Sequence, residues 1–263
     1  MTEREGKFAA ELGRVAVWPL VAESYRSVFH RPTLFLRLGW CWLASAWLLG
    51  LALDLLLADN RGRLIGQFLT VPLLIAFAVA WHRITLSREA PKELQASRFG
   101  SRELRYFAAM VIFMSLVFGV LVLGGLLYEL LAGGAKLRDL QWVIGILAPI
   151  GSLFATRFVL VLPAIAIGDR TTSLVRSWRL TRGHTLPLFA GLCAACVPMM
   201  LFKYAIVGGM YLLLGSVAAD YSLLRFVLVI PLFLFFDLAG TAASVSFLSH
   251  AYRAFTRGDF AIR

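Results

Sequence analysis

The segment 177–184, with the sequence SWRLTRGH, holds the densest group of side chains that could bind a ligand. Arg176, Arg179 and Arg182 recur every three residues, so in a helix they line one slowly turning stripe. Arginine binds phosphate through a bidentate fork, and a basic helix carrying a Trp such as Trp178 is typical of a membrane surface. The pattern therefore indicates either a dedicated phosphate site or a general contact with anionic headgroups. The candidate residues are Arg176, Trp178, Arg179 and Arg182 in both cases.

Catalytic chemistry and metal binding are not expected. No Asp, Glu or Cys lies close enough in sequence to His184 to suggest an acid–base or nucleophile partner. The four histidines form no pair spaced by four residues, as a helical metal site would require. Cys193 and Cys196 form a C-x-x-C motif inside an apolar stretch, without a second ligand pair, so we interpret them as small packing residues. The sequence predicts a protein that is not an enzyme and that holds no metal or cofactor.

A second group of candidates consists of charged residues inside apolar stretches, namely Arg157, Lys203 and Asp237. Charges at membrane depth are costly, and they usually face a bundle interior or a wet cavity. Lys203 and Asp237 are each expected roughly 20 Å below the outer boundary, with Arg157 at a similar depth. We therefore expect a buried cluster in which Asp237 pairs with Lys203 or Arg157. A structural ion pair, a substrate or proton pathway, and snorkelling or a misplaced span boundary are the alternative interpretations.

The overall composition places these residues in a membrane protein. Of the 263 residues, 60% are hydrophobic and 16% are charged. Soluble domains are nearer to about 45–50% apolar and about 25% charged, so one soluble core could not bury this much apolar surface. The net charge of +11 is then best explained by basic loops on the cytoplasmic side, and nucleic acid is not an expected partner.

Six apolar stretches are long enough to cross a bilayer, which takes about 20 helical residues. They cover about residues 32–57, 64–86, 106–131, 140–167, 186–217 and 222–255. Residues 1–14 mix acidic and basic side chains without a short apolar core and cleavage site, so no secretory signal is expected. The sequence predicts an all-α fold with a single integral membrane domain over residues 1–263.

Basic residues indicate how the spans are oriented. Twenty of the 26 Lys and Arg residues fall on the side that carries both termini, and five fall in the opposite loops. Lys203, within a span, completes the count. This bias follows the positive-inside rule, so both termini are predicted to be cytoplasmic. The even number of spans agrees with that orientation.

Each odd-numbered span follows a short basic segment with helical spacing of apolar residues, at about residues 18–31, 91–105 and 171–184. Such segments are typical of amphipathic helices lying on the cytoplasmic membrane face. Their recurrence indicates either an internal duplication or the repeated needs of cytoplasmic loops in a six-span protein. In the third segment, Thr171 or Thr172 is expected to cap a helix and Gly183 to end it in a left-handed conformation.

The stretch RFVLVLPAIAIGD followed by SLVRSWRLTRGHTLPLFAGL resembles a signature of six-span bacterial inner-membrane proteins of the YciC-like kind. The same pattern is similar to the membrane domain attached to some glycerophosphodiester phosphodiesterases. The resemblance implies a bacterial inner-membrane location and little assigned biochemistry. It does not imply phosphodiesterase activity, because that chemistry belongs to a separate soluble domain whose metal-binding residues this chain lacks.

The sequence thus predicts a non-enzymatic, multi-pass inner-membrane protein that engages anionic lipid or a membrane partner in envelope maintenance. A protein partner or a second copy of the chain is compatible with this reading. The alternative is a small transporter or permease that uses the Arg157, Lys203 and Asp237 level as its binding site.

Overall fold

A computed structural model describes residues 17–57, 60–87, 99–132, 137–214 and 229–260, and within these ranges the chain is helical without any strand. Six of the helices are long and apolar enough to cross a membrane. Their apolar windows are Pro32–Leu53, Phe68–Leu86, Ser101–Leu130, Gln141–Phe158, Thr185–Met210 and Ile230–Thr256. The predictions of an all-α fold and of six candidate spans are confirmed.

Nine helices and one 3₁₀ turn follow one another along the described part of the chain. Their bounds are α2 Val17–Phe29, α3 Pro32–Leu57, α4 Asn60–Ser87, α5 Ser101–Ala132, α6 Leu137–Ala155, the 3₁₀ turn η2 Thr156–Phe158, α7 Val161–Ile167, α8 Leu174–Leu180, α9 Thr185–Leu214 and α12 Ile230–Phe260. The expected start of the sixth span at about residue 222 lies outside the described residues, and so does the end of the fifth beyond Leu214. Residues 91–98 of the second basic segment are likewise outside them, while Arg102 and Arg105 belong to the first turns of α5.

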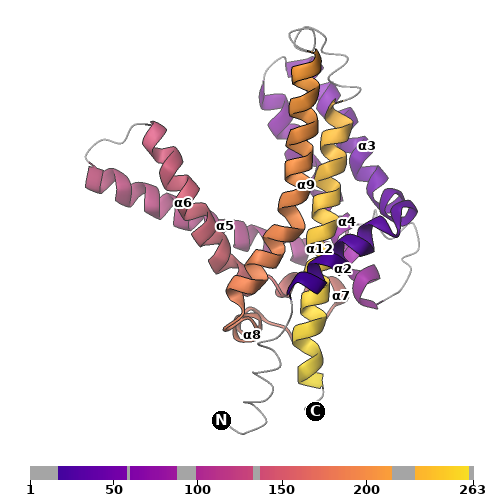
Figure 1. Cartoon of the computed structure of the whole chain (residues 1–263), viewed down its shortest axis with the longest axis vertical. Coiled ribbons are helices and arrows are strands. Elements are labelled where there is room, and N and C mark those ends of the chain that lie inside the picture. The colour runs from indigo at the N-terminus through magenta and orange to yellow at the C-terminus, as the bar shows by residue number, and fades with distance from the viewer. Residues whose placement is uncertain (1–16, 58–59, 88–98, 133–136, 215–228, 261–263) are drawn as a thin grey trace.

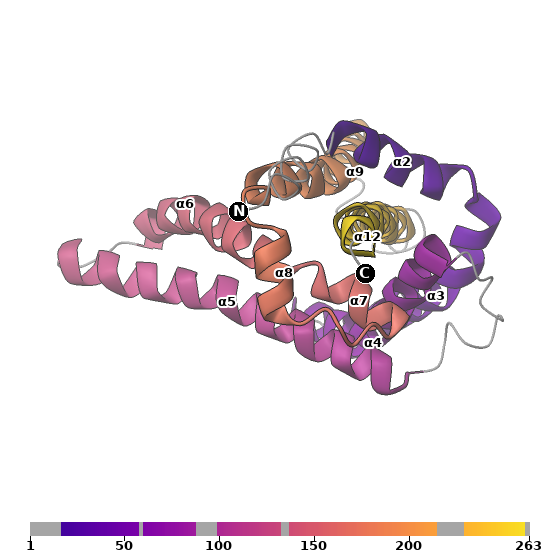
Figure 2. The ribbon, with the colours of Figure 1, turned by 90° about the horizontal axis from the view of Figure 1, so that it is seen from below.

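The C-terminal helix α12 forms the centre of the bundle. It packs against α2, α3, α4, α7 and α9, which surround it when the molecule is seen from below (Figure 2). Small buried residues such as Ala242, Ala243 and Ser246 let these neighbours approach closely. Gly191 of α9 illustrates the tightness, because a Cβ there would meet the fully buried Phe247 ring and would lie 2.5 Å from Val17 Cγ1.

Aromatic rings fill the core between α3, α4 and α12. Phe35 lies edge-on to Phe77, Trp81 and Phe235, with ring centroids 5.8–6.2 Å apart. This is the favoured geometry of aromatic pairs. The Trp81 indole donates a 2.7 Å hydrogen bond to Ser246 Oγ, so its polar atom is satisfied within the apolar core.

His82 lies at the centre of a buried hydrogen-bonded chain. Ser249 Oγ donates to the Val245 carbonyl at 2.9 Å and can therefore accept from His82 Nδ1, 2.7 Å away. His82 Nε2 is then the acceptor for the Tyr106 hydroxyl at 3.2 Å. Only this arrangement gives each of the three protons an acceptor, because a hydroxyl has one proton to donate. His82 is therefore a neutral imidazole that joins α4, α5 and α12.

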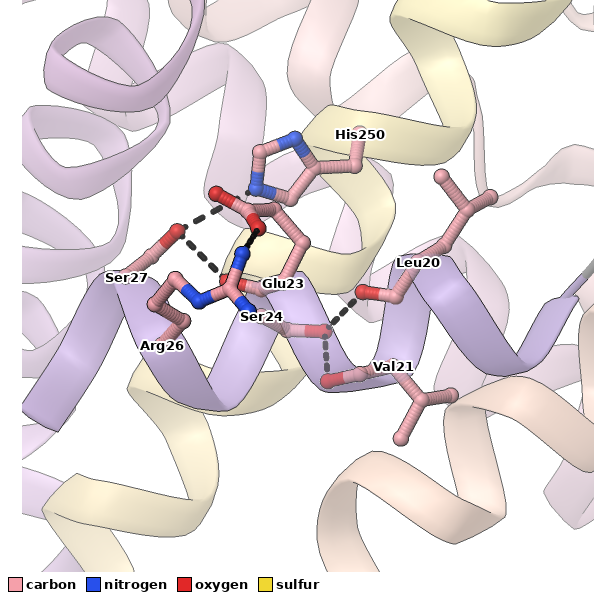
Figure 3. Close-up of polar contacts among 7 residues, drawn as sticks. All are labelled: Leu20, Val21, Glu23, Ser24, Arg26, Ser27 and His250. Carbon is pink, nitrogen blue, oxygen red and sulfur yellow. Dashed lines mark hydrogen bonds and ion pairs between the residues drawn. The ribbon is translucent and has the colours of Figure 1, made fainter.

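Helix α2 lies across α12 rather than along it (Figures 1 and 2). Ser27 Oγ donates to the Glu23 carbonyl at 2.8 Å, which leaves it to accept from His250 Nε2 of α12 at 3.2 Å (Figure 3). Tyr25 donates to the Ala194 carbonyl of α9 at 2.9 Å. That carbonyl loses its usual helical partner because the residue four positions later is a proline, Pro198, which has no N–H. Burial raises the pKa of the Tyr25 phenol, which favours the donating, protonated form.

Helices α5 and α6 pair with each other and project away from the other spans (Figure 1). Tyr106 and Ala109 near the start of α5 are buried, but much of the rest of its apolar surface is exposed. Leu123, Leu126 and Leu130 are among the many large apolar side chains that it exposes. A soluble monomer rarely exposes a contiguous apolar surface of this kind, whereas lipid chains would cover it.

The fourth span, expected over about residues 140–167, is interrupted, and the prolines within it are residues expected to kink or break a helix. Helix α6 ends at Ala155, the turn η2 follows, and the short helix α7 begins at Val161. Pro163 explains part of the interruption, because it cannot donate to the Val159 carbonyl and is tolerated in the first turn of a new helix. The Val159 carbonyl instead accepts from the Leu162 N–H at 3.1 Å. Helix α7 then packs inside the bundle against α4, α5 and α12.

Candidate functional site

The segment SWRLTRGH binds to the break in the fourth span. The carbonyl of Arg157 lies in the η2 turn, where the regular helical ladder is interrupted. Ser177 Oγ donates to that carbonyl at 2.8 Å, and Thr181 Oγ1 lies 3.1 Å from it. Both residues are fully buried, and they are one helical turn apart, so their hydroxyls point the same way. Helix α8 is thereby attached to η2 through the Arg157 carbonyl, a backbone group at the break.

Trp178 lies between the two hydroxyl residues and packs on the same break. Its ring lies 5.5 Å from the Phe154 ring and 5.3 Å from the Phe158 ring, centroid to centroid. The Arg157 guanidinium lies over the Trp178 ring, with Cζ 4.1 Å from the centroid. This is a cation–π contact, which orients the guanidinium and covers one of its faces. Trp178, predicted as a headgroup-level residue, thus holds Arg157.

Arg176, Arg179 and Arg182, predicted as one stripe, do not act as one, because the first two belong to α8 and Arg182 lies in the turn after it. Arg176 is half-buried, and its Nη1 donates to Thr171 Oγ1 at 2.6 Å. Arg179 and Arg182 are exposed. The difference arises because Arg176 lies in the first turn of α8, beside the loop that precedes the helix. Only the outer two arginines therefore present their side chains to the surroundings.

The ends of α8 differ in one detail from the expectation. Ser173 caps the helix, its hydroxyl lying 3.3 Å from the Arg176 N–H, whereas Thr171 or Thr172 had been expected in that role. Gly183 has a left-handed backbone with a φ of 82°, as expected, in the turn that leads to α9. Thr171 and Thr172 instead donate hydrogen bonds to another residue.

That residue is Asp169, which sequence reasoning did not single out. Its carboxylate accepts from the Thr171 N–H at 2.8 Å, the Thr171 hydroxyl at 2.7 Å and the Thr172 hydroxyl at 2.8 Å. The Tyr252 hydroxyl of α12 donates to the second carboxylate oxygen. Partial burial alone would raise the pKa of Asp169, but the hydrogen bonds from Tyr252, Thr171 and Thr172 outweigh it and lower the pKa to about 2. Asp169 therefore stays ionised and ties the loop before α8 to the central helix.

A local signal for Asp169 was present in the sequence. Gly168 ends α7 in a left-handed conformation with a φ of 78°, and the Asp169 N–H then donates back to the Ala164 carbonyl at 2.9 Å. An Asp after a helix-ending glycine and two residues before a threonine is typical of an Asx turn. The bond to Tyr252, 83 residues away, could not be read from sequence.

The structure brings two of the three expected intramembrane charges together. Lys203 Nζ of α9 lies 2.7 Å from Asp237 Oδ1 of α12 and 3.5 Å from the centroid of the Phe233 ring. The lysine side chain is 7% exposed and the aspartate side chain is 40% exposed. Asp237 is seven residues from the start of α12, which is about 10 Å along the helix. Residues 222–228, which are expected to precede α12 in this span, lie outside the described residues, so the depth expected for Asp237 stays a prediction.

Arg157 does not join this pair. It is one residue from the end of the fourth apolar window, at Phe158, where the break occurs. Lys203 is 18 residues beyond the start of α9, or about 27 Å along that helix. The structure thus places Arg157 on Trp178 and leaves one cation facing one anion at the Lys203–Asp237 pair.

The remaining candidates lie apart from both groups. His184 packs edge-on against Phe255, and its Nδ1 lies 3.2 Å from the Arg182 carbonyl. Cys193 and Cys196 are half-buried, and burial of this kind is ordinary for small packing residues. Within the described part of the chain, no three His, Cys, Asp or Glu side chains are grouped so that they could hold a metal ion.

The six long apolar helices fit a multi-pass membrane protein. Comparison of the chain with known protein families, curated proteins and solved structures finds no match.

Proposed function

We propose that the protein is a non-enzymatic, multi-pass protein of a bacterial inner membrane that binds anionic lipid headgroups through α8 on the cytoplasmic face. The observation that carries the proposal is the attachment of α8 to the η2 break. Because Ser177 and Thr181 bind the Arg157 carbonyl, α8 and the turn after it have a fixed orientation, in which Arg179 of α8 and Arg182 of the turn are exposed. Two arginines held near the end of an apolar span suit lipid phosphate.

The rest of the chain supports the same assignment. The excess of basic residues on the side of both termini favours a cytoplasmic position for α8, in line with the resemblance to YciC-like proteins. The apolar surface of α5 and α6 fits a lipid environment. Envelope maintenance, by contact with a membrane partner or with lipid alone, is the role that this arrangement suits.

The proposal is tested by the lipid that co-purifies with the protein after gentle solubilisation. Removing the positive charge of α8 and of the turn after it with R176Q, R179Q and R182Q together should deplete anionic lipid. The control is R61Q with R63Q, which removes basic charge from the side predicted to be outer. Equal anionic lipid in the α8 variant and the wild type would reject the proposal.

A small transporter is the second candidate, and the Lys203–Asp237 pair is the observation that favours it. An ion pair inside two apolar spans, with the carboxylate 40% exposed, resembles the paired charges that mark ion or substrate pathways. The test is uptake or efflux by protein reconstituted in vesicles, with D237N as the inactive variant. Substrate movement that D237N leaves unchanged would count against this site.

A further inference from the structure

Arg157 carries a charge that the described part of the protein does not neutralise. No carboxylate there forms an ion pair with it, and no acceptor takes its guanidinium N–H groups; its contact is the Trp178 ring. Two acidic residues of the described part of the chain are engaged elsewhere. Asp169 accepts from Thr171, Thr172 and Tyr252, and Asp237 pairs with Lys203. A half-buried guanidinium without acceptors is costly unless another molecule supplies them.

The site around Arg157 is fixed from two directions. Its backbone carbonyl is held by α8, and its side chain lies over a Trp ring that Phe154 and Phe158 support. Trp178 covers one face of the planar guanidinium, and a ring stacked on a face leaves the N–H groups along the edge able to donate. Two such groups side by side match two oxygens of one phosphate.

An apolar stripe on α6 leads to this guanidinium. Ile146, Ile150 and Phe154 follow one another every four residues, so they lie on one face of the helix. They are exposed by 64%, 52% and 44%, respectively. The stripe runs along the membrane-spanning part of α6, and Arg157 lies at the end of that span. A cation at the span end and an apolar track beside it complement the two parts of a phospholipid.

We propose that Arg157 binds the phosphate of one phospholipid, whose acyl chain lies along Ile146, Ile150 and Phe154. This inference rests on the proposed function, since it assigns a single defined lipid position beside the more general contact of Arg179 and Arg182. Free phosphate shares the headgroup chemistry but not the chain. The two sources therefore differ in whether the α6 stripe contributes to binding.

The test is native mass spectrometry of the full chain titrated with phosphatidylglycerol, and separately with inorganic phosphate. The wild type should take up a first lipid more tightly than later ones. R157Q should weaken that first step by about 10- to 100-fold, the loss expected for a charge-assisted hydrogen bond. R157K, which keeps the charge without the fork, should fall between, and I150A should weaken lipid binding only.

The outcomes separate the two proposals. If the wild type binds no lipid in preference to neutral detergent, the proposed function and this inference both fail. If R179Q with R182Q reduces binding while R157Q and R157K bind the first lipid as the wild type does, the inference fails and the proposed function stands. If inorganic phosphate displaces the first lipid completely and I150A has no effect, the site binds free phosphate and the lipid assignment is wrong.

Discussion

Removing both hydroxyls that reach the Arg157 carbonyl should destabilise the protein by more than the sum of the two single changes. The Thr181 hydroxyl has one proton and three carbonyls within reach, those of Ser177 at 2.9 Å, Arg157 at 3.1 Å and Trp178 at 3.3 Å. In S177A it can donate to Arg157, and in T181V the Ser177 hydroxyl still does so. Each single change therefore leaves the carbonyl with one partner.

The magnitude follows from this redundancy. Each single variant should lose about 0.5 kcal/mol, the low end for one replaceable hydrogen bond. The double variant leaves the carbonyl without a partner between two fully buried residues, which costs about 2 kcal/mol. The coupling is then about 1 kcal/mol, well above the roughly 0.3–0.5 kcal/mol within which independent changes add.

The assay is the apparent melting temperature in detergent, followed by size-exclusion chromatography after heating at one fixed rate. For a chain of this size 1 kcal/mol corresponds to about 2–4 °C, so the double variant should melt about 2–4 °C lower than additivity predicts. T185V is the control, because Thr185 Oγ1 donates to the Thr181 carbonyl and not to Arg157. Additive shifts for S177A and T181V, equal to those of S177A with T185V, would refute the attachment of α8 to the break.

Other changes test the packing, the ion pair and the loop. G191A should destabilise by about 1–3 kcal/mol because its methyl group meets buried Phe247, whereas G208A in the same helix has open space and should be neutral or stabilising, by thermal melting. K203M or D237N alone should lower the melting temperature through an unpaired charge or a lost partner, and K203M with D237L should recover most of it. D169N should be less stable than the wild type at pH 7. The pKa of Asp169 is lowered to about 2, so this difference should persist above about pH 4 and vanish as the pH falls through 2, by melting across that range.

The parts of this structure that were predicted from sequence are those that depend on local composition. The bounds of α3 and the approximate position of each span followed from apolar length alone. The pairing of Lys203 with Asp237 followed from the free-energy cost of placing a charged side chain inside a membrane. Two opposite charges in adjacent spans have few other partners.

What was missed depends on tertiary contacts. The break at η2 occurs six residues before Pro163, and it is stable because hydroxyls from α8 reach the exposed carbonyl. Nothing in the sequence of residues 140–167 indicates that hydroxyl groups from elsewhere in the chain will donate to this carbonyl. Asp169 likewise depends on Tyr252, and the position of Arg157 depends on the Trp178 ring. Which of Arg176, Arg179 and Arg182 stay exposed also depends on the fold.

The central claim, that α8 selects anionic headgroups, is tested most directly by lipid selection in equal mixtures of phosphatidylglycerol and phosphatidylcholine. Protein exchanged into such mixed micelles is repurified, and the ratio of the two bound lipids is measured by chromatography and mass spectrometry. The wild type should retain more phosphatidylglycerol than the mixture contains, and R179Q with R182Q should approach the ratio of the mixture. Equal enrichment in the wild type and in this variant, with R61Q and R63Q as the charge control, would contradict the claim.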